Sequence, residues 1–307
     1  MRAPVWKAAP TALPVTRTGQ ASVAVPVVRV SAGVVGPGAP SCGQAGDVVI
    51  PVRDVNPVQR TPWVTYALIA VNFVVFLLTP ASGIIVSGTD SLAQTCEQRA
   101  FFDHYAAIPV ELVHDHQLPV VADGEVGFGL RGPGCIVTEP SYHKSPVLSA
   151  LTSLFLHGGW LHILGNMLFL WIFGNNVEDR FGRLRYLLFY LGVGMLATYG
   201  FALADPDSTE ALIGASGAIA GVLGAYLILY PWARVWSLVP FLLFIPLRLP
   251  AWVVLGLWFF LQWVYTAGYA VSSGGSVAYL AHVLGFLAGV LVALVIRGSE
   301  GRSTPVI

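Results

Sequence analysis

HGGWLHILGN (residues 157–166) places His162 and Asn166 inside a hydrophobic segment of membrane-spanning length. Ser216, in GASG, and His282, in AHVLGFLAG, lie in two further segments of this kind. Polar side chains are costly in hydrocarbon, so an ionisable residue within a membrane segment is by default a candidate functional residue. A serine nucleophile, a histidine base and donors for an oxyanion are sufficient for peptide hydrolysis. The question is whether the membrane topology brings these four residues together.

Hydropathy predicts six membrane-spanning helices, because about 20 consecutive apolar residues cross a bilayer. The six segments are residues 63–84, 158–177, 184–204, 213–230, 251–271 and 276–297. Of the 307 residues, 55% are hydrophobic and 10% are charged, whereas soluble domains carry about 25% charged residues. Residues 231–250 are also apolar but contain four prolines, so we expect a loop or an interfacial stretch there. The expected fold class is an all-α membrane protein.

The rest of the chain divides into tails and one long loop. Residues 1–50 are rich in Ala, Val, Pro and Gly without a helical or strand period, which predicts a disordered tail. Residues 51–298 would form the membrane domain, with a long outer loop at 85–146 between the first two segments. Residues 299–307 would form a second, short tail.

The distribution of positive charge predicts the orientation of the six segments. With the N-terminus inside, 13 of the 16 Lys and Arg residues lie on the inner side: Arg2, Lys7, Arg17, Arg29, Arg53, Arg60, Arg180, Arg183, Arg185, Arg234, Arg248, Arg297 and Arg302. Only Arg99, Arg131 and Lys144 then lie outside. Inner loops of membrane proteins carry an excess of Lys and Arg, so both termini should be cytoplasmic. The pattern fits a bacterial inner (plasma) membrane.

Alternation of the segments places the four polar residues at one depth. The second, fourth and sixth segments all run from outside to inside, and each carries its polar residues near its start. His162 and Asn166 are four residues apart and share a helix face. Ser216 lies at a predicted helix N-terminus, where free N–H groups favour an anion. We therefore expect a shared site near the outer face.

Small residues predict close packing of the fourth and sixth segments. The fourth has glycines at 217, 221 and 224, and the sixth has Ala281, Gly285 and Gly289 at a spacing of four. Small residues repeated at this spacing let transmembrane backbones approach closely. Packing these two faces together would bring His282 toward Ser216. Gly214 and Gly217, on either side of this serine, would allow a sharp bend and a close approach of substrate.

HGGWLHILGN, GASG and AHVLGFLAG, in this order and on alternate segments, resemble the rhomboid family of intramembrane serine proteases. The resemblance covers roughly residues 48–297 and includes Glu178 and Arg180, which match that family's Glu-x-Arg motif. It implies a six-helix rhomboid-like bundle that hydrolyses transmembrane protein substrates near the outer face of the lipid bilayer. The catalytic residues would be the dyad of Ser216 and His282, with no cofactor and no metal.

The resemblance also implies roles for the residues around the dyad. His162 and Asn166 would assist the oxyanion together with the backbone N–H of Ser216. His157 lies off the face of His162, since five residues correspond to about 140° of helix rotation, and we expect it to support the site by hydrogen bonding. Many relatives carry a tyrosine four residues after the serine, stacked on the histidine, whereas this chain has Ala220. Two aromatics are candidates for orienting His282 instead, namely Trp258 and Tyr279. A Trp-Arg pair found in the first loop of some relatives is absent from this sequence.

The outer loop contains a possible cross-link. It holds six potential metal-binding or disulfide-forming residues: Cys96, His104, His114, His116, Cys135 and His143. Their spacings match no standard zinc finger. A disulfide between Cys96 and Cys135 is favoured, because the loop would lie in an oxidising compartment. Cys42, in the inner tail, should remain reduced.

Two other classes of function compete with proteolysis. An inactive rhomboid-like protein would bind membrane helices for quality control or trafficking, but the intact Ser216 and His282 argue against it. A small transporter would need a polar path across the membrane, whereas the polar residues cluster on one side. The net charge of zero gives no indication of nucleic-acid binding. Nothing in the sequence sets the oligomeric state.

Overall fold

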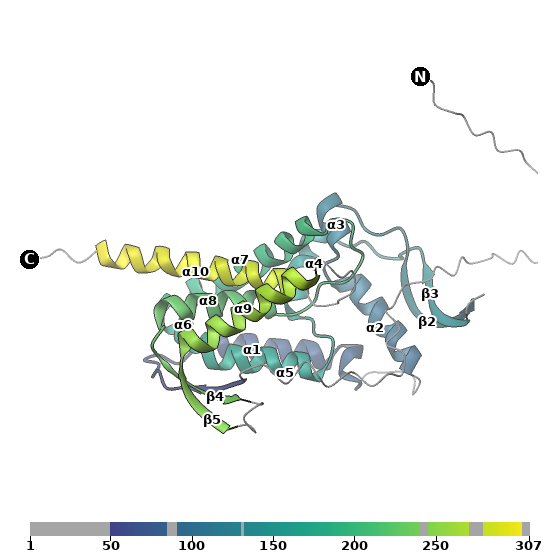
Figure 1. The fold of residues 1–307 in the computed structure, drawn as a ribbon. Coiled ribbons are helices and arrows are strands. Elements are labelled where there is room, and N and C mark those ends of the chain that lie inside the picture. The colour runs from purple at the N-terminus through teal and green to yellow at the C-terminus, as the bar shows by residue number, and fades with distance from the viewer. Residues whose placement is uncertain (1–49, 85–90, 130–131, 240–244, 270–278, 303–307) are drawn as a thin grey trace, which may run out of the picture.

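The computed structural model describes residues 50–84, 91–129, 132–239, 245–269 and 279–302. Elongated helices lie side by side in the body of the molecule, with β4 and β5 at one end and α2, β2 and β3 at the other (Figure 1). The tail predicted for residues 1–50 lies, up to residue 49, outside the described residues. So do Cys42 and residues 303–307 of the predicted C-terminal tail.

Apolar helices occupy the six places that hydropathy predicts. The first is α1 (Trp63–Leu77). The second is one continuous helix made of α5 (Trp160–Phe169), the π-helical turn η3 (Leu170–Gly174) and α6 (Asn175–Phe181). The other four are α7 (Arg183–Ala204), α8 (Ser216–Leu229), α9 (Ala251–Tyr269) and α10 (Tyr279–Arg302). Among the described residues, two helices are long and apolar enough to span a membrane alone, Arg183–Ala204 and Tyr279–Gly298. A third span is obtained if the pair Pro146–Phe155 and Trp160–Phe181, bent by 82°, counts as one.

Two of the remaining apolar helices are shorter than a full bilayer crossing. Helix α1 has 15 residues and α8 has 14, whereas α9 has 19. At 1.5 Å per residue, the 14 residues of α8 extend about 21 Å, against about 30 Å for a typical hydrocarbon core. Residues 213–215, predicted as the start of this helix, precede it instead.

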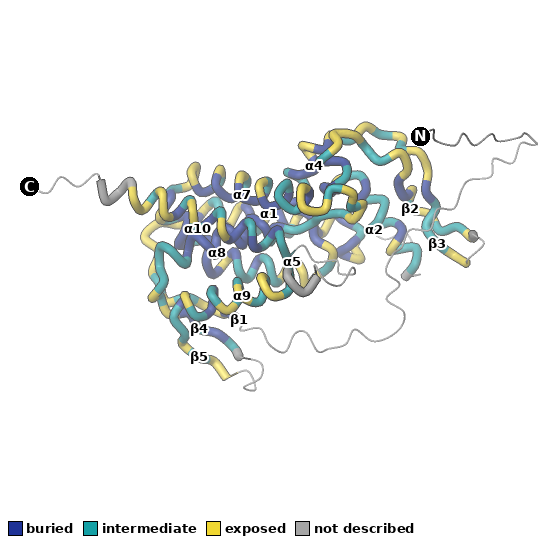
Figure 2. The backbone as a smooth tube through the Cα atoms, turned by 45° about the horizontal axis from the view of Figure 1, so that its top comes forward, coloured by how far each residue is buried: buried dark blue, intermediate teal, exposed yellow. Residues whose placement is uncertain are grey.

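Helix α8 forms the centre of the bundle. Ten consecutive residues, Gly217 to Tyr226, are buried, and Figure 2 shows α8 dark blue. The surrounding helices expose large apolar side chains, for example Leu188 on α7 (62% exposed), Phe260 on α9 (58%) and Val295 on α10 (72%). A helical bundle that is apolar both in its core and on its outer surface is suited to a lipid environment.

The N-terminus of α1 is held by a buried carboxylate from α6. Glu178 accepts hydrogen bonds from the backbone N–H groups of Val64 and Thr65 and from the Thr65 hydroxyl, at 2.7–3.0 Å. An anion at this place satisfies N–H groups that have no partner within the helix. The residue of the Glu-x-Arg motif therefore ties the second apolar helix to the first.

The outer loop is folded rather than irregular, which the sequence analysis did not predict. It contains the helices α2 (Ser91–Tyr105) and α3 (Pro109–His114) and an antiparallel hairpin of β2 (Val121–Gly129) and β3 (Gly132–Thr138). After the loop come α4 (Pro146–Thr152) and the 3-10 turn η2 (Ser153–Phe155). Lys144 and Glu111, both almost fully buried, form an ion pair of 2.6 Å within it. Paired burial of this kind is how a protein accommodates ionised groups away from water.

A small sheet forms at the opposite end of the molecule. Strands β1 (Ile50–Asp54), β4 (Arg234–Val239) and β5 (Ile245–Pro250) pair antiparallel in the order β1-β4-β5. We expected a loop or interfacial stretch over residues 231–250, because of its prolines. Pro246 and Pro250 lie in β5, an edge strand, where a missing backbone N–H need not break the ladder. The all-α prediction thus overlooked two small sheets in a mostly helical chain.

Candidate active site

Ser216 and His282 lie within hydrogen-bonding distance. The Oγ atom of Ser216, at the first residue of α8, is 2.8 Å from Nε2 of His282, in the first turn of α10. This is the contact that a serine nucleophile needs with its general base. The two residues are 66 positions apart in the chain, so the packing of α8 against α10 brings them together.

Glycines set the separation of these two helices. A Cβ atom built on Gly285 would collide with the backbone oxygen of Gly217, and one built on Gly289 would collide with that of Gly221. A Cβ on Gly224 would likewise meet the backbone of Phe286. The helices therefore touch along their backbones over two turns, as the repeated small residues predict.

A cavity of about 380 Å³ opens beside the dyad. Residues from α5, α8, α9 and α10 line it, among them His162, Asn166, Ser216, Gln262 and His282. The structure thus gathers all four polar residues singled out from the sequence around one cavity. Polar groups converging in a largely apolar cavity are typical of a small binding or reaction site.

Asn166 and His162 line the wall of the cavity with hydrogen-bond donors. The Nδ2 atom of Asn166 is buried and has no hydrogen-bond partner among the described residues. Nδ1 of His162 makes a long contact of 3.5 Å with the Gly158 N–H, which favours the tautomer with the proton on Nε2. A Cβ atom on Gly214 would lie 2.8 Å from that Nε2 and 3.6 Å from the Ser216 Oγ. The His162 ring and the serine oxygen therefore lie close to the same point beside Gly214, and Asn166 lines the same cavity.

Gly214 has a backbone conformation that explains its residue type. Its φ of +122° is one that L side chains rarely adopt. Its N–H donates to the carbonyl of Ser153 at 2.9 Å, which fixes the segment that leads into α8. Gly217, by contrast, is helical, and its lack of a side chain serves contact with α10 and with Ala197 of α7.

His157 is fully buried behind this wall. Its ring lies edge-on to that of His162, with the ring centroids 5.0 Å apart. Its supporting role stays a prediction. Ala220, at the position where many relatives carry a tyrosine, is also fully buried and packs against α10.

Besides Ser216, three side chains of the described residues lie around the His282 ring. The rings of Trp258 and Tyr279, the two candidates from the sequence, have centroids 6.1 and 6.2 Å from that of His282, at 33° and 90°. Neither ring is stacked on the imidazole. The third neighbour, Gln262 on α9, was missed: its Oε1 lies 2.7 Å from Nδ1 of His282. Its signal in the sequence is a polar residue within an apolar helix, the same signal that singled out Asn166.

The other aromatics of α9 have different surroundings. Phe260 and Trp263 are 58% and 55% exposed, as expected for lipid-facing residues. Phe259 stacks on Phe286 of α10 with ring centroids 4.6 Å apart, and Trp258 lines the cavity.

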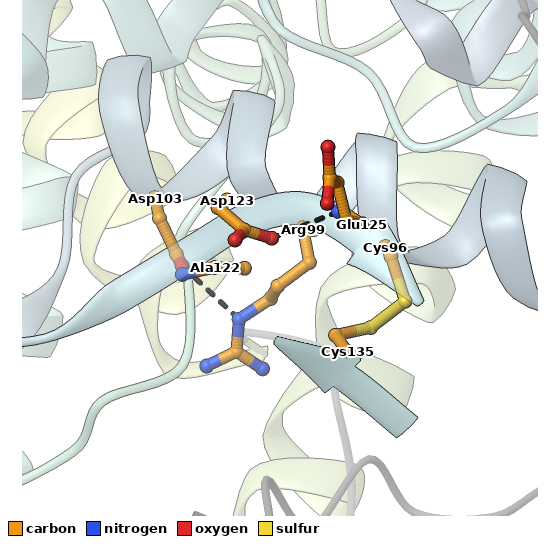
Figure 3. Close-up of a disulfide and its surroundings, with 7 residues drawn as sticks. All are labelled: Cys96, Arg99, Asp103, Ala122, Asp123, Glu125 and Cys135. Atoms are coloured by element: carbon orange, nitrogen blue, oxygen red, sulfur yellow. Dashed lines mark hydrogen bonds and ion pairs between the residues drawn. A yellow bond between two sulfur atoms is a disulfide. The ribbon is translucent and has the colours of Figure 1, made fainter. Parts of the chain in front are cut away.

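Cys96 and Cys135 form a disulfide in the outer region. It joins the helix α2 to the strand β3, as Figure 3 shows. On the same helix Asp103 accepts hydrogen bonds from the side chain of Arg99 and the N–H of Ala122, both at 3.0 Å. In the part of the chain that the structure describes, no group of three or more His, Cys, Asp or Glu residues could hold a metal ion.

Comparison with known proteins identifies the family. Residues 144–299, half of the chain, match the family model of the rhomboid domain. RHOMBOID-like protein 1 of Arabidopsis thaliana is 29% identical over 168 residues, which is 54% of this chain and 39% of that protein. The mitochondrial Rhomboid protein 1 of Saccharomyces cerevisiae is 32% identical over 150 residues, 47% of this chain and 40% of that protein.

A bacterial relative is similar over a shorter stretch. Rhomboid protease GluP of Bacillus subtilis is 42% identical over 77 residues, 25% of this chain and 15% of that protein. For the two eukaryotic proteins named above, the match spans about two fifths of their length. The range matched by the family model includes Ser216 and His282. The chain belongs to the rhomboid family of multi-pass, helical intramembrane serine proteases.

Proposed function

We propose that this protein is an intramembrane serine endopeptidase that cleaves transmembrane protein substrates near the outer membrane face. The 2.8 Å contact between Ser216 Oγ and His282 Nε2, at the wall of a cavity with an unpartnered Asn166 amide, carries this proposal. An inactive helix-binding protein would have no need to keep this arrangement.

The chemistry would proceed through an acyl-enzyme. The Ser216 oxygen attacks the peptide carbonyl carbon while Nε2 of His282 takes the hydroxyl proton. The carbonyl oxygen becomes an oxyanion, which His162, Asn166 and the Ser216 N–H stabilise. The C–N bond then breaks as His282 returns the proton to the leaving amine. Water, deprotonated by the same imidazole, attacks the ester and releases the acid and the serine.

The proposed topology has six spans with both termini on the inner side. The segment before Ser216 bonds to the outer region, through the Leu212 N–H to the Ala107 carbonyl. At the other end of α8, the Tyr226 hydroxyl donates to Asp54 in the small sheet. These contacts support a site on the side of residues 85–146, which would be the outer face. We also propose a membrane domain of residues 51–298 with inner tails at both ends. Matches occur in plants, yeast and bacteria, so these relatives do not support the bacterial inner membrane that we expected from the sequence over another membrane.

Purified protein in detergent or proteoliposomes tests the function directly. Wild-type protein should cleave a fluorogenic transmembrane peptide and react with a serine-directed fluorophosphonate probe. Ser216→Ala should lose both activities while retaining its thermal stability. The control Ser208→Ala, in the segment before α8, should keep both. His282→Ala should be as inactive as the double variant, because the two residues act as one unit.

Cleavage by Ser216→Ala at the wild-type rate would overturn the proposal. So would a wild-type protein that binds transmembrane peptides without cleaving them, which is the outcome expected of an inactive relative.

A further inference from the structure

We propose that Gln262 is the positioning residue of the dyad, holding His282 in the tautomer that can act as a base. This inference rests on the proposed function and extends it, since a serine-histidine pair alone leaves the orientation of the imidazole unexplained. The hydrogen bond between the two side chains is its starting point.

The geometry places Gln262 on the far side of His282 from the serine. Its Oε1 is 2.7 Å from Nδ1, while Nε2 of the same ring is 2.8 Å from the Ser216 Oγ. Gln262 lies one turn after Trp258 on α9 and lines the same cavity. Ser216, His282 and Gln262 thus form a continuous line of hydrogen bonds across α8, α10 and α9.

The chemistry of imidazole determines which group donates and which accepts in these two hydrogen bonds. A neutral ring carries one proton, and the nitrogen that faces the serine must be without it to accept the hydroxyl proton. The proton therefore belongs on Nδ1, where it needs an acceptor. A side-chain amide oxygen is such an acceptor, and it favours the productive tautomer over its alternative. The same oxygen bonds to the imidazolium that forms when the serine is deprotonated.

Two other described neighbours of His282 contact it through their aromatic rings. Trp258 and Tyr279 approach with their rings at centroid distances of 6.1 and 6.2 Å. In the described part of the chain, His162 on α5 lines the same cavity, and Tyr265 on α9 stacks on Tyr279. Among the described residues that line the cavity there is no Asp, Glu, Lys or Arg. An amide thus occupies the place that a carboxylate holds in a catalytic triad.

Steady-state kinetics with a fluorogenic transmembrane peptide test the proposal across a pH range. Gln262→Met keeps the length of the side chain and removes the acceptor. It should lower kcat by about 10- to 100-fold, the range for losing one hydrogen bond to a group that becomes charged, with KM changing less. The matched control Phe260→Leu, on the lipid-facing side of α9, should leave kcat and KM unchanged.

Gln262→Glu distinguishes positioning from packing. It restores an acceptor at the same place, so turnover should exceed that of Gln262→Met. Its carboxylate would also favour the protonated imidazole, which is the inactive form of the base. The acid limb of the kcat/KM profile should therefore move to higher pH by about 1–3 units. A residue that only fills space would not shift this limb.

The inference is overturned if Gln262→Met keeps kcat within about threefold of wild type with an unchanged pH profile, or if a folded Gln262→Glu leaves the acid limb in place. Should the introduced carboxylate prevent folding, Gln262→Met decides alone. These outcomes differ from failure of the proposed function, in which wild-type protein is inactive or Ser216→Ala remains active.

Discussion

Gly289 on α10 lies against Gly221 on α8 so closely that a Cβ atom on the first would collide with the backbone oxygen of the second. The two residues are in the middle of a glycine contact that also includes Gly285 and Gly217. This contact fixes how far His282 lies from Ser216, so it links the packing of the bundle to the geometry of the dyad.

Gly289→Ala should therefore destabilise the protein and reduce its activity. The added methyl group forces α10 away from α8, and overpacking of this kind costs about 1–3 kcal/mol. Thermal unfolding in detergent and peptide cleavage measure the two effects. Gly192→Ala on α7 is the control, because its Cβ atom meets nothing within 4 Å. Equal stability of the two variants would show that the close contact is not needed.

Glu178→Ala should lower the unfolding temperature without changing the pH dependence of catalysis. The variant leaves the N–H groups of Val64 and Thr65 at the start of α1 without their acceptor. Loss of a helix cap costs about 0.5–2 kcal/mol, and burial places the effect at the upper end. The exposed Glu139→Ala is the matched control. A Glu178→Ala variant as stable as this control would contradict the capping role.

The disulfide should stabilise the outer region selectively. The cysteines are separated by 39 positions, and closing a loop of this length contributes roughly 3–4 kcal/mol in the chain-entropy model. Cys96→Ser with Cys135→Ser should therefore make residues 91–138 more sensitive to limited proteolysis, while Cys42→Ser should have no effect. Thiol labelling of denatured, non-reduced protein should find one reactive cysteine. Three reactive cysteines would contradict the cross-link.

Asp54 should make stability depend on pH. Burial raises the pKa of this carboxyl from 3.8 to about 6, against the opposing effect of hydrogen bonds from Tyr226 and Asn176. A carboxyl whose pKa is raised by folding binds its proton more tightly in the folded state. It therefore favours folding most below pH 3.8, and that contribution is lost as the pH rises through about 6.

Asp54→Asn mimics the protonated form and should remove this contribution to the pH dependence. At pH 7.5 the variant should be at least as stable as wild type, and its unfolding midpoint should change less between pH 4 and 7. The exposed Asp207→Asn serves as the control. A wild-type midpoint that rises over this range, with Asp54→Asn following the same curve, would refute the assignment.

The apolar helices and the residues of the cavity could be predicted because both leave local signals. A run of apolar residues marks a membrane helix, and a histidine or serine within it stands out. The predicted alternation in direction of these helices then placed Ser216, His282, His162 and Asn166 at one depth, and the four residues line one cavity. This reasoning needed no knowledge of the contacts between helices.

The strands and the folded outer region left no such signal. Strand β1 pairs with β4, which is far away in the sequence, and both are short segments next to prolines or polar residues. The packing of α2 on the hairpin is visible only in the structure, from which of its side chains are buried; Cys96, for example, is fully buried. Gln262 was overlooked for a different reason, since its role depends on which nitrogen of His282 faces the serine.

Asn166→Ala should give a partially active enzyme rather than an inactive one. In the proposed mechanism its Nδ2 would be one donor beside His162 and the Ser216 N–H, and removing one oxyanion donor typically costs about 10²–10³ in turnover. KM should change less than kcat, because the donor interacts with charge that appears only in the transition state. Leu164→Ala, an exposed residue on the same helix, should retain wild-type kinetics. Steady-state rates on a fluorogenic transmembrane peptide distinguish oxyanion stabilisation from a role in substrate binding or packing. A raised KM with an unchanged kcat would make Asn166 a residue for substrate binding or packing, and the oxyanion would then depend on His162 and the backbone alone.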